Sequence, residues 1–285
     1  MPVTPAVKAT NVELRYGSTV AVASSSFDIP AGRITVLIGP NGSGKSTLLN
    51  GIAGLMRTSS GSLQVAAALA EPAPAYVLQT TKVNEALPVT VREVVTMGRY
   101  TATGPHGRLR DSDRRAVQRA MARMGITGLA GSQLHELSGG QRQRVFVAQG
   151  LAQEHPMLLL DEPLTGLDLP SALAIDEVIH DERNRATTVV MSTHDLAEAM
   201  AADHVILLSK RVVAWGPPEA ALTATNLTAA YGASLLHLEG DSVFIDDPAH
   251  RPVPGRHHHR ERIIHIEPSA SDAHGGEPGG DHQAR

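Results

Sequence analysis

A glycine-rich loop between an apolar run and a helical pattern is the feature that most constrains this chain. The run Ile34–Ile38 is short, apolar and rich in β-branched residues, as in a buried parallel strand. The next nine residues, 39 to 47, read Gly-Pro-Asn-Gly-Ser-Gly-Lys-Ser-Thr, and a helical pattern extends from Lys45 to about Ala53. Strand, glycine loop and helix in this order are the context that a phosphate-binding loop requires.

The chemistry of this loop suits a nucleotide. Glycines allow backbone N–H groups to approach phosphate oxygens without a Cβ in the way. Lys45 is predicted to place its charge at the β- and γ-phosphates, and Ser46 to offer its hydroxyl to Mg²⁺. A chance glycine turn is the alternative, which the flanking strand and helix make improbable. The residues predicted to bind nucleotide here are Gly39, Pro40, Asn41, Gly42, Ser43, Gly44, Lys45, Ser46 and Thr47.

Further apolar runs predict an α/β sheet. A helix over roughly Ser171–Arg183 lies between two of these runs, which gives a βαβ rhythm. Residues 58–75 are expected to form a strand pair and a loop. The remaining predicted strands are Val12–Tyr16, Val20–Phe27, Tyr76–Gln79, Met157–Leu160, Thr188–Met191 and Val205–Leu208. The remaining predicted helices are Val91–Arg99, Asp111–Met124 and Gly140–Ala152.

Two adjacent carboxylates follow the apolar run Met157–Leu160. Ligands bind beyond the carboxyl ends of such strands, so these side chains point to the predicted site. Asp161 is expected to hold Mg²⁺ through water, and Glu162 to act as general base for the attacking water. By itself, such a pair is usually a solvated acidic turn; the phosphate loop upstream favours the functional interpretation.

A second anion site is predicted at a separate helix start. Ser138-Gly139-Gly140, followed by Gln141, has the pattern of an N-cap and glycine turn opening a helix. Either both helix starts bind the same nucleotide, or each completes a site on another copy.

The motifs together resemble one known family. Leu137-Ser-Gly-Gly-Gln141 is similar to the signature of ATP-binding-cassette (ABC) ATPases, and the other motifs occur in that family's order. Gln79 resembles the Q-loop glutamine, and Leu164-Thr-Gly-Leu-Asp168 resembles the D-loop. His194 resembles the switch histidine that contacts the γ-phosphate. Tyr16 lies where the family places an aromatic residue on the adenine ring.

The resemblance implies an architecture and a mechanism. It implies an α/β P-loop NTPase (RecA-like) domain over residues 1–238, with an antiparallel β subdomain and a helical subdomain at about 80–150. Gln79, Glu162 and His194 would be catalytic, and Ser46, Gln79 and Asp161 would bind Mg²⁺. ATP would lie between the phosphate loop of one copy and Ser138–Gln141 of another, with Asp168 nearby. The partners implied are a second ATPase copy, a transmembrane permease and, indirectly, a solute-binding protein.

Composition and the spacing between motifs narrow the kind of ABC protein that this chain resembles. The net charge of −4 gives no support for a nucleic-acid partner, and the absence of cysteine fits a reducing compartment. No apolar stretch is long enough for a membrane helix, and no signal-peptide pattern is present. Only 92 positions (137 − 45) separate Lys45 from Leu137, which excludes relatives with an inserted coiled coil. We therefore expect a free-standing transporter subunit, peripheral on the cytoplasmic face of a bacterial membrane, rather than a nucleotide-gated regulatory module.

Three longer segments narrow the resemblance to ATPases for zinc, manganese and iron-chelate uptake: Leu87–Tyr100, Glu136–Gln153 and Leu227–Gly232. Within that group the chain is most similar to the zinc-type ATPases called AztA, although it has Val-Leu-Gln where the wider group has Val-Pro-Gln. The resemblance implies zinc import, with manganese or iron-chelate import, or less readily export, as alternatives.

A histidine-rich tail is predicted over residues 239–285. It holds seven of the fourteen histidines and little hydrophobic periodicity, which is typical of a disordered segment. Imidazoles are donors for a metal such as Zn²⁺, so we hypothesise that the tail buffers or senses zinc. A solubilising tail is the alternative. The histidines concerned are His250, His257, His258, His259, His265, His274 and His282.

Overall fold

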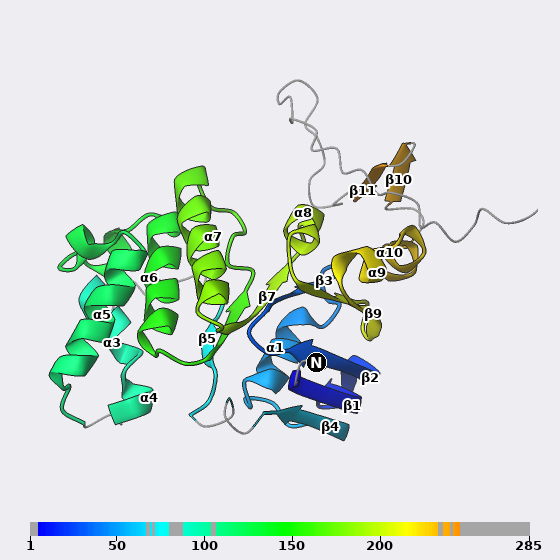
Figure 1. Ribbon diagram of the computed structural model, residues 1–285, viewed down its shortest axis with the longest axis horizontal. Helices are drawn as coiled ribbons and strands as arrows, with labels where there is room; N and C mark the ends of the chain where they lie inside the picture. The colour runs from blue at the N-terminus through cyan, green and yellow to red at the C-terminus, as the bar shows by residue number, and fades with distance from the viewer. Residues whose placement is uncertain are drawn as a thin grey trace, which may run out of the picture. The chain divides into compact units, whose positions relative to one another are not determined.

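A six-stranded sheet carries the predicted nucleotide loop. The structure, a computed structural model, describes residues 5–66, 69, 72–79, 88–103, 107–232, 236–239 and 242–245. The strand order is β5-β6-β7-β3-β8-β9, parallel except for the antiparallel edge strand β9 (Figure 1). The strands span Ile34–Ile38 (β3), Ala75–Val77 (β5), Met157–Asp161 (β6), Thr188–Thr193 (β7), His204–Leu208 (β8) and Val212–Gly216 (β9). The predicted α/β sheet is confirmed.

A second, antiparallel sheet has the order β2-β1-β4. Its strands are Pro5–Tyr16 (β1), Thr19–Pro30 (β2) and Ser60–Val65 (β4), so β1 and β2 are longer than the sequence predicted. The strand pair expected at 58–75 is wrong as far as those residues are described: β4 is one strand, and its partner is β1. Strand β1, which is distant in sequence, makes the backbone hydrogen bonds that a second strand of a local hairpin would have made.

Helix α1, Lys45–Ile52, packs against both sheets. It contacts β1, β2 and β4 on one side and β6 and β7 on the other. Leu48, Leu49 and Ile52 are buried in the same apolar cluster as Leu14 and Phe27. Each such side chain stabilises the fold by about 1.5–3 kcal/mol through its burial. The start of α1 is therefore fixed from both sides.

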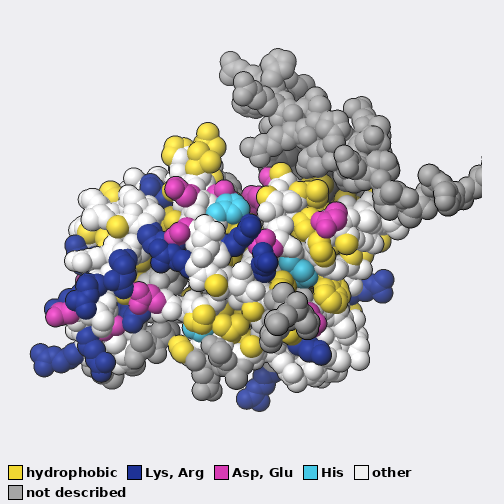
Figure 2. All heavy atoms as spheres, in the orientation of Figure 1, with side chains coloured by type: hydrophobic (Ala, Val, Ile, Leu, Met, Phe, Trp, Pro, Cys, Tyr) yellow, Lys and Arg dark blue, Asp and Glu magenta, His cyan; other side chains and the backbone are white. Residues whose placement is uncertain are grey.

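A helical part lies between β5 and β6 in sequence. It comprises α3 (Val91–Met97), α4 (Tyr100–Thr103), α5 (Asp111–Arg123) and α6 (Gly139–Ala152). α3 and α5 both pack on α6, which also contacts α7 (Leu169–Asn184). Figure 1 shows these helices together on one side of the sheet, and Figure 2 shows Lys and Arg side chains gathered over them. Three short helices follow: α8 (Leu196–Met200), α9 (Pro218–Ala221) and α10 (Ala224–Tyr231). An antiparallel sheet and a helical part beside an α/β core agree with the expected fold.

The residues after Tyr231 form a separate unit, Gly232–Arg285. Its described residues form one hairpin of β10 (Leu236–Glu239) and β11 (Ser242–Ile245). The boundary predicted at 238 falls within β10 and stays a prediction. All seven tail histidines lie outside the described residues. In the described part of the chain, no helix is long and apolar enough to cross a membrane.

Candidate functional site

The start of α1 is built to leave backbone N–H groups for a ligand. Gly44 is its N-cap, with a left-handed φ of 105°, and no side chain among the described residues caps this end. A Cβ on Gly44 would lie 2.7 Å from Val22 Cγ2 and 2.8 Å from the Ala21 carbonyl oxygen, so only glycine fits. A helix start without a cap presents orphan donors and the positive end of the helix dipole. This is the chemistry of a phosphate site.

Lys45 extends its ammonium group to the base of the loop. Its side chain is 5% exposed, and Nζ donates hydrogen bonds to the carbonyl oxygens of Gly39 (2.9 Å) and Pro40 (3.4 Å). Nζ also lies 3.9 Å from Glu162 Oε1. Burial lowers the pKa of Lys45, and the nearby carboxylates of Glu162 and Asp161 oppose that shift. A bound phosphate would place further negative charge beside this buried ammonium group and so stabilise its charged form.

A residue of the neighbouring strand bonds both predicted acidic residues, Asp161 through its carboxylate and Glu162 through its backbone amide. Ser192 Oγ donates a 2.5 Å hydrogen bond to Asp161 Oδ1 and accepts a 2.9 Å hydrogen bond from the Glu162 amide. Glu162 has a left-handed φ of 46°, which non-glycine residues rarely adopt. Gln79 Nε2 donates a 2.9 Å hydrogen bond to Glu162 Oε2. The sequence analysis missed Ser192; the only sequence signal is a polar residue within the buried apolar run of β7, and its partner is set by the strand register.

A cavity of about 280 Å³ joins the loop to these groups. Its lining comprises the following residues: Ala21, Asn41, Gly42, Ser43, Gly44, Lys45, Ser46, Thr47, Gln79 and Glu162. The structure thus brings together the loop, the predicted Q-loop glutamine and the predicted base. Their assigned roles in binding and catalysis stay predictions.

The donor atoms of three predicted ligands fit Mg²⁺, and two of these residues, Ser46 and Gln79, line the cavity. Ser46 supplies an exposed hydroxyl, Gln79 an amide oxygen, and Asp161 a carboxylate with one oxygen engaged by Ser192. Such hard oxygen ligands suit Mg²⁺, which is bound by few protein groups and keeps waters and phosphate oxygens. Among the described residues, no group of three or more His, Cys, Asp or Glu is arranged to hold a metal ion. Bound Mg²⁺ would neutralise phosphate charge.

Tyr16 and His194 lie outside the cavity lining, as do the predicted residues Gly39, Pro40 and Asp161. Tyr16 ends β1 with 54% of its surface exposed, and its hydroxyl accepts a 3.4 Å hydrogen bond from Asn50. His194 is exposed just after β7. An exposed ring at each position is compatible with the predicted adenine and γ-phosphate contacts, which stay predictions.

The signature-like residues form a separate cluster at the starts of α6 and α7. Ser138 caps α6 by accepting a 3.2 Å hydrogen bond from the Gln141 amide, and Gln141 Oε1 accepts one of 3.0 Å from the Ser138 amide. Asp168 caps α7 by accepting a 2.8 Å hydrogen bond from the Ser171 amide, which lowers the pKa of the Asp168 carboxyl group. A Cβ on Gly140 would collide with Ser171 Oγ and Asp168 Oδ2. Within one chain these residues do not line the cavity over the phosphate loop.

Comparison with known protein families shows which family the chain belongs to. The family described as ABC transporter matches residues 22–165. The chain belongs to the ABC transporter family. It is therefore an ATP-binding-cassette ATPase, whose ATP hydrolysis is coupled to transport.

Two curated relatives are similar to this ABC ATPase over most of their length. The chelated iron transport system membrane protein YfeB of Yersinia pestis is 39% identical over 86% of this chain and 85% of its own. The manganese transport system ATP-binding protein MntA of Synechocystis sp. is 37% identical over 78% of this chain and 88% of its own.

Two solved structures share the fold. A candidate metal-chelate type ABC transporter in an inward-facing conformation matches with a TM-score of 0.70 and 30% identity, over 80% of this chain and 88% of that chain. The dimeric structure of MJ0796, a bacterial ABC transporter cassette, matches with a TM-score of 0.65 and 25% identity, over 74% of this chain and 98% of that chain.

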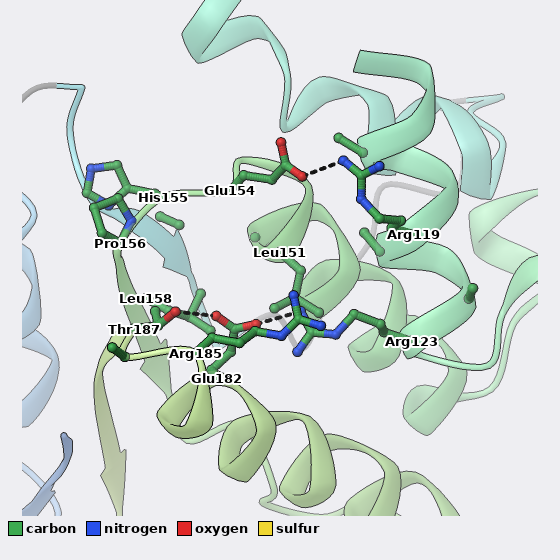
Figure 3. Close-up of a pocket in the computed structure, with 16 residues that line it drawn as sticks. Arg119, Arg123, Leu151, Glu154, His155, Pro156, Leu158, Glu182, Arg185 and Thr187 are labelled. Atoms are coloured by element: carbon green, nitrogen blue, oxygen red, sulfur yellow. Dashed lines mark hydrogen bonds and ion pairs between the residues drawn. The ribbon is translucent and has the colours of Figure 1, made fainter. Parts of the chain in front are cut away.

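A larger cavity, of about 550 Å³, lies elsewhere in the ABC ATPase, between α5, α6 and α7 (Figure 3). Its charged groups bind each other: Arg119 pairs with Glu154 at 2.7 Å, and Arg123 with Glu182 at 2.5 Å. Glu182 also accepts a 2.6 Å hydrogen bond from Thr187. None of the sequence-predicted site residues lines this cavity. The pair of Arg123 and Glu182 joins α5 to α7, and the nucleotide site is predicted at the smaller cavity.

Proposed function

We propose that this ABC ATPase energises the uptake of manganese or of chelated iron. The observation that carries the proposal is the similarity to YfeB and MntA, which extends over 85% and 88% of those proteins. The match to a candidate metal-chelate type transporter supports the same cargo class. These relatives favour manganese or chelated iron over the zinc that the sequence resemblance first implied. Zinc remains one arm of the test.

We propose that the working unit contains two copies of the chain. Within one chain the cavity holds Lys45, Gln79 and Glu162 but not Ser138–Gln141. A site completed by the second copy's Ser138–Gln141 accounts for this arrangement, and MJ0796 provides a dimeric relative. Mg·ATP would then be enclosed between the phosphate loop of one copy and the signature of the other.

In this proposal each predicted catalytic residue has a separate role in ATP hydrolysis. Lys45 binds the β- and γ-phosphates, and Glu162 accepts a proton from the attacking water. Gln79 orients the Glu162 carboxylate through the hydrogen bond of 2.9 Å between them. His194 reaches the γ-phosphate only in the closed dimer, in agreement with its exposure here.

We further propose that a permease docks beside Gln79 on the cytoplasmic face of the membrane. Leu78, Met97 and Tyr100 are 53%, 41% and 42% exposed, although large apolar side chains are usually buried. Leu78 lies just before residues 80–87, which are outside the described residues, and Met97 and Tyr100 lie further along the chain, in and after α3. An apolar contact at Leu78 would connect the permease to Gln79 through one peptide bond. A solute-binding protein would act through the permease.

The test is metal uptake by cells that lack this ATPase. Radioactive manganese, chelated iron and zinc are offered in parallel to deletion cells that carry the wild-type protein, its Glu162→Gln variant or no copy. We expect manganese or chelated-iron accumulation to return with the wild type alone. Restoration of zinc uptake alone would replace the proposed cargo. Greater retention of metal in the deletion cells would indicate an exporter.

A further inference from the structure

Through one oxygen atom, Ser192 links the Asp161 carboxylate to the backbone amide of Glu162 in the predicted nucleotide site. Its hydroxyl proton is directed to Asp161 Oδ1 at 2.5 Å, and the same oxygen accepts the Glu162 amide at 2.9 Å. Ser192 is 0% exposed and Asp161 is 5% exposed, so water does not compete for these bonds. A hydroxyl group has one proton and two lone pairs, so it can serve both partners at once.

The strand register places Ser192 at this point. β6 and β7 are parallel neighbours, and Asp161 pairs with Ser192 in their register. β7 is central in the sheet because β3 pairs with its other edge. All six residues of β7 are buried, so a polar residue in this strand needs a partner within the protein. Ser192 finds its partners in the two carboxylate residues that end β6.

Glu162 needs such support because its backbone is strained. A φ of 46° is left-handed, and a non-glycine residue keeps this conformation only where its surroundings enforce it. The Ser192 hydroxyl fixes the Glu162 amide, and Gln79 fixes the carboxylate at the other end of the residue. The backbone bond therefore sets the direction in which the Glu162 side chain leaves the strand.

We infer that Ser192 is a positioning residue for ATP hydrolysis. It holds the backbone of Glu162 in the conformation that directs the carboxylate into the cavity. Its bond to Asp161 Oδ1 leaves the other carboxylate oxygen of that residue for the Mg²⁺ that it would hold. His194 follows two positions later, so displacement of this part of β7 would also move the histidine. Ser192 itself does not line the cavity.

The first experiment measures ATP hydrolysis by the purified full chain. Ser192→Ala is expected to lower kcat by about 10- to 100-fold, as loss of groups that orient metal ligands does, with the KM for ATP nearly unchanged. Ser192→Thr, which keeps the hydroxyl, is expected to retain more of kcat than Ser192→Ala. Thr35→Val is the matched control: Thr35 is equally buried, on adjacent β3, and its hydroxyl has no hydrogen-bond partner among the described residues. This control is expected to keep wild-type kcat.

A double variant separates positioning from loss of structure. If Ser192 acts through Glu162, Ser192→Ala has little further effect on kcat once Glu162 is changed to Gln. A purely structural defect would lower kcat by the same factor in both backgrounds, and that result would overturn the inference. Wild-type kcat in Ser192→Ala would overturn it as well.

Hydrogen exchange gives a readout that needs neither ATP nor Mg²⁺. In the nucleotide-free protein, the Glu162 amide is expected to exchange faster in Ser192→Ala than in the wild type, while the amides of β3 keep their protection. Unchanged exchange at Glu162 would show that the hydroxyl does not hold this amide. All three measurements are independent of the cargo, so failure of the metal-uptake proposal would leave them interpretable.

Discussion

The side-chain amide of Gln79 donates a hydrogen bond of 2.9 Å to the carboxylate of Glu162. The two residues lie 83 positions apart and follow the neighbouring parallel strands β5 and β6. Their contact couples the segment that precedes residues 80–87 to the predicted base. A movement of Gln79 would therefore change the orientation of the Glu162 carboxylate.

Replacing Glu162 by Gln is expected to reduce ATP hydrolysis by roughly 10²- to 10⁴-fold, because an amide cannot accept the proton of the attacking water. ATP affinity should be retained, since the phosphate loop and Lys45 are unchanged. Steady-state hydrolysis and equilibrium titration with ATP measure the two quantities. Glu177→Gln, at an exposed position of α7, is the control. Turnover near the wild-type rate would remove Glu162 from its assigned role.

Two adjacent glycines of the signature-like motif are expected to respond differently to alanine. A Cβ on Gly140 would collide with Ser171 and Asp168, whereas a Cβ on Gly139 would meet open space. Gly140→Ala should lower the free energy of unfolding by about 1–3 kcal/mol through overpacking. Gly139→Ala should be neutral or slightly stabilising, because alanine favours a helix. Urea unfolding of both variants measures the difference; equal stabilities would contradict the tight contact between α6 and α7.

Arg123 is expected to hold the helical part to the core. It pairs with Asp181 at 2.8 Å and with Glu182, whose side chain is only 10% exposed. Arg123→Met would leave Glu182 buried with one fewer partner, and should lower the free energy of unfolding by about 3 kcal/mol.

The matched control for Arg123 is Arg114→Met on the same helix. Arg114 pairs with Asp111, but their side chains are 67% and 79% exposed, so this change should cost less than about 1 kcal/mol. Similar losses from both variants, measured by urea unfolding, would show that the Arg123 ion pairs do not join the two parts.

His204 is expected to make stability depend on pH. It begins β8, its ring lies 5.9 Å from the Trp215 ring, and burial lowers its pKa, an effect that the Asp28 carboxylate opposes. Because the unfolded chain binds a proton at this residue near pH 6.5 and the folded chain binds it only at lower pH, stability falls as pH drops below about 6.5.

The comparison variant for this effect is His204→Gln, which stays neutral. The unfolding free energy of the wild type, minus that of His204→Gln, is expected to decrease as the pH is lowered from about 7.5 to 5.5. A difference that is constant with pH would refute the assignment.

The parts of the site that could be predicted from sequence are those set by local patterns. The order of β3, glycine loop and α1 follows from consecutive residues, and so does the position of Asp161 and Glu162 at the end of a buried strand. Gln79 was assigned by resemblance, and the structure places it against Glu162.

The parts that could not be predicted depend on contacts between distant segments. Ser192 lies 31 positions from Asp161, and its role appears only once the register of β6 against β7 is known. The pairing of β4 with β1 likewise leaves no local signal. Asp168 was assigned to nucleotide binding by resemblance, which stays a prediction. Its bond to the Ser171 amide, which caps α7, depends on the conformation of the helix start.

A ligand bound at the uncapped start of α1 would contribute to the stability of the fold. Any anion that binds these amides adds to the stability of the native state by an amount that grows with its concentration, since the unfolded chain has no such site. The lifetime of this protein in a cell would then follow the cell's supply of nucleotide. Loss of the nucleotide pool as a whole, rather than conversion of ATP into ADP, would then expose the ATPase to unfolding and proteolysis.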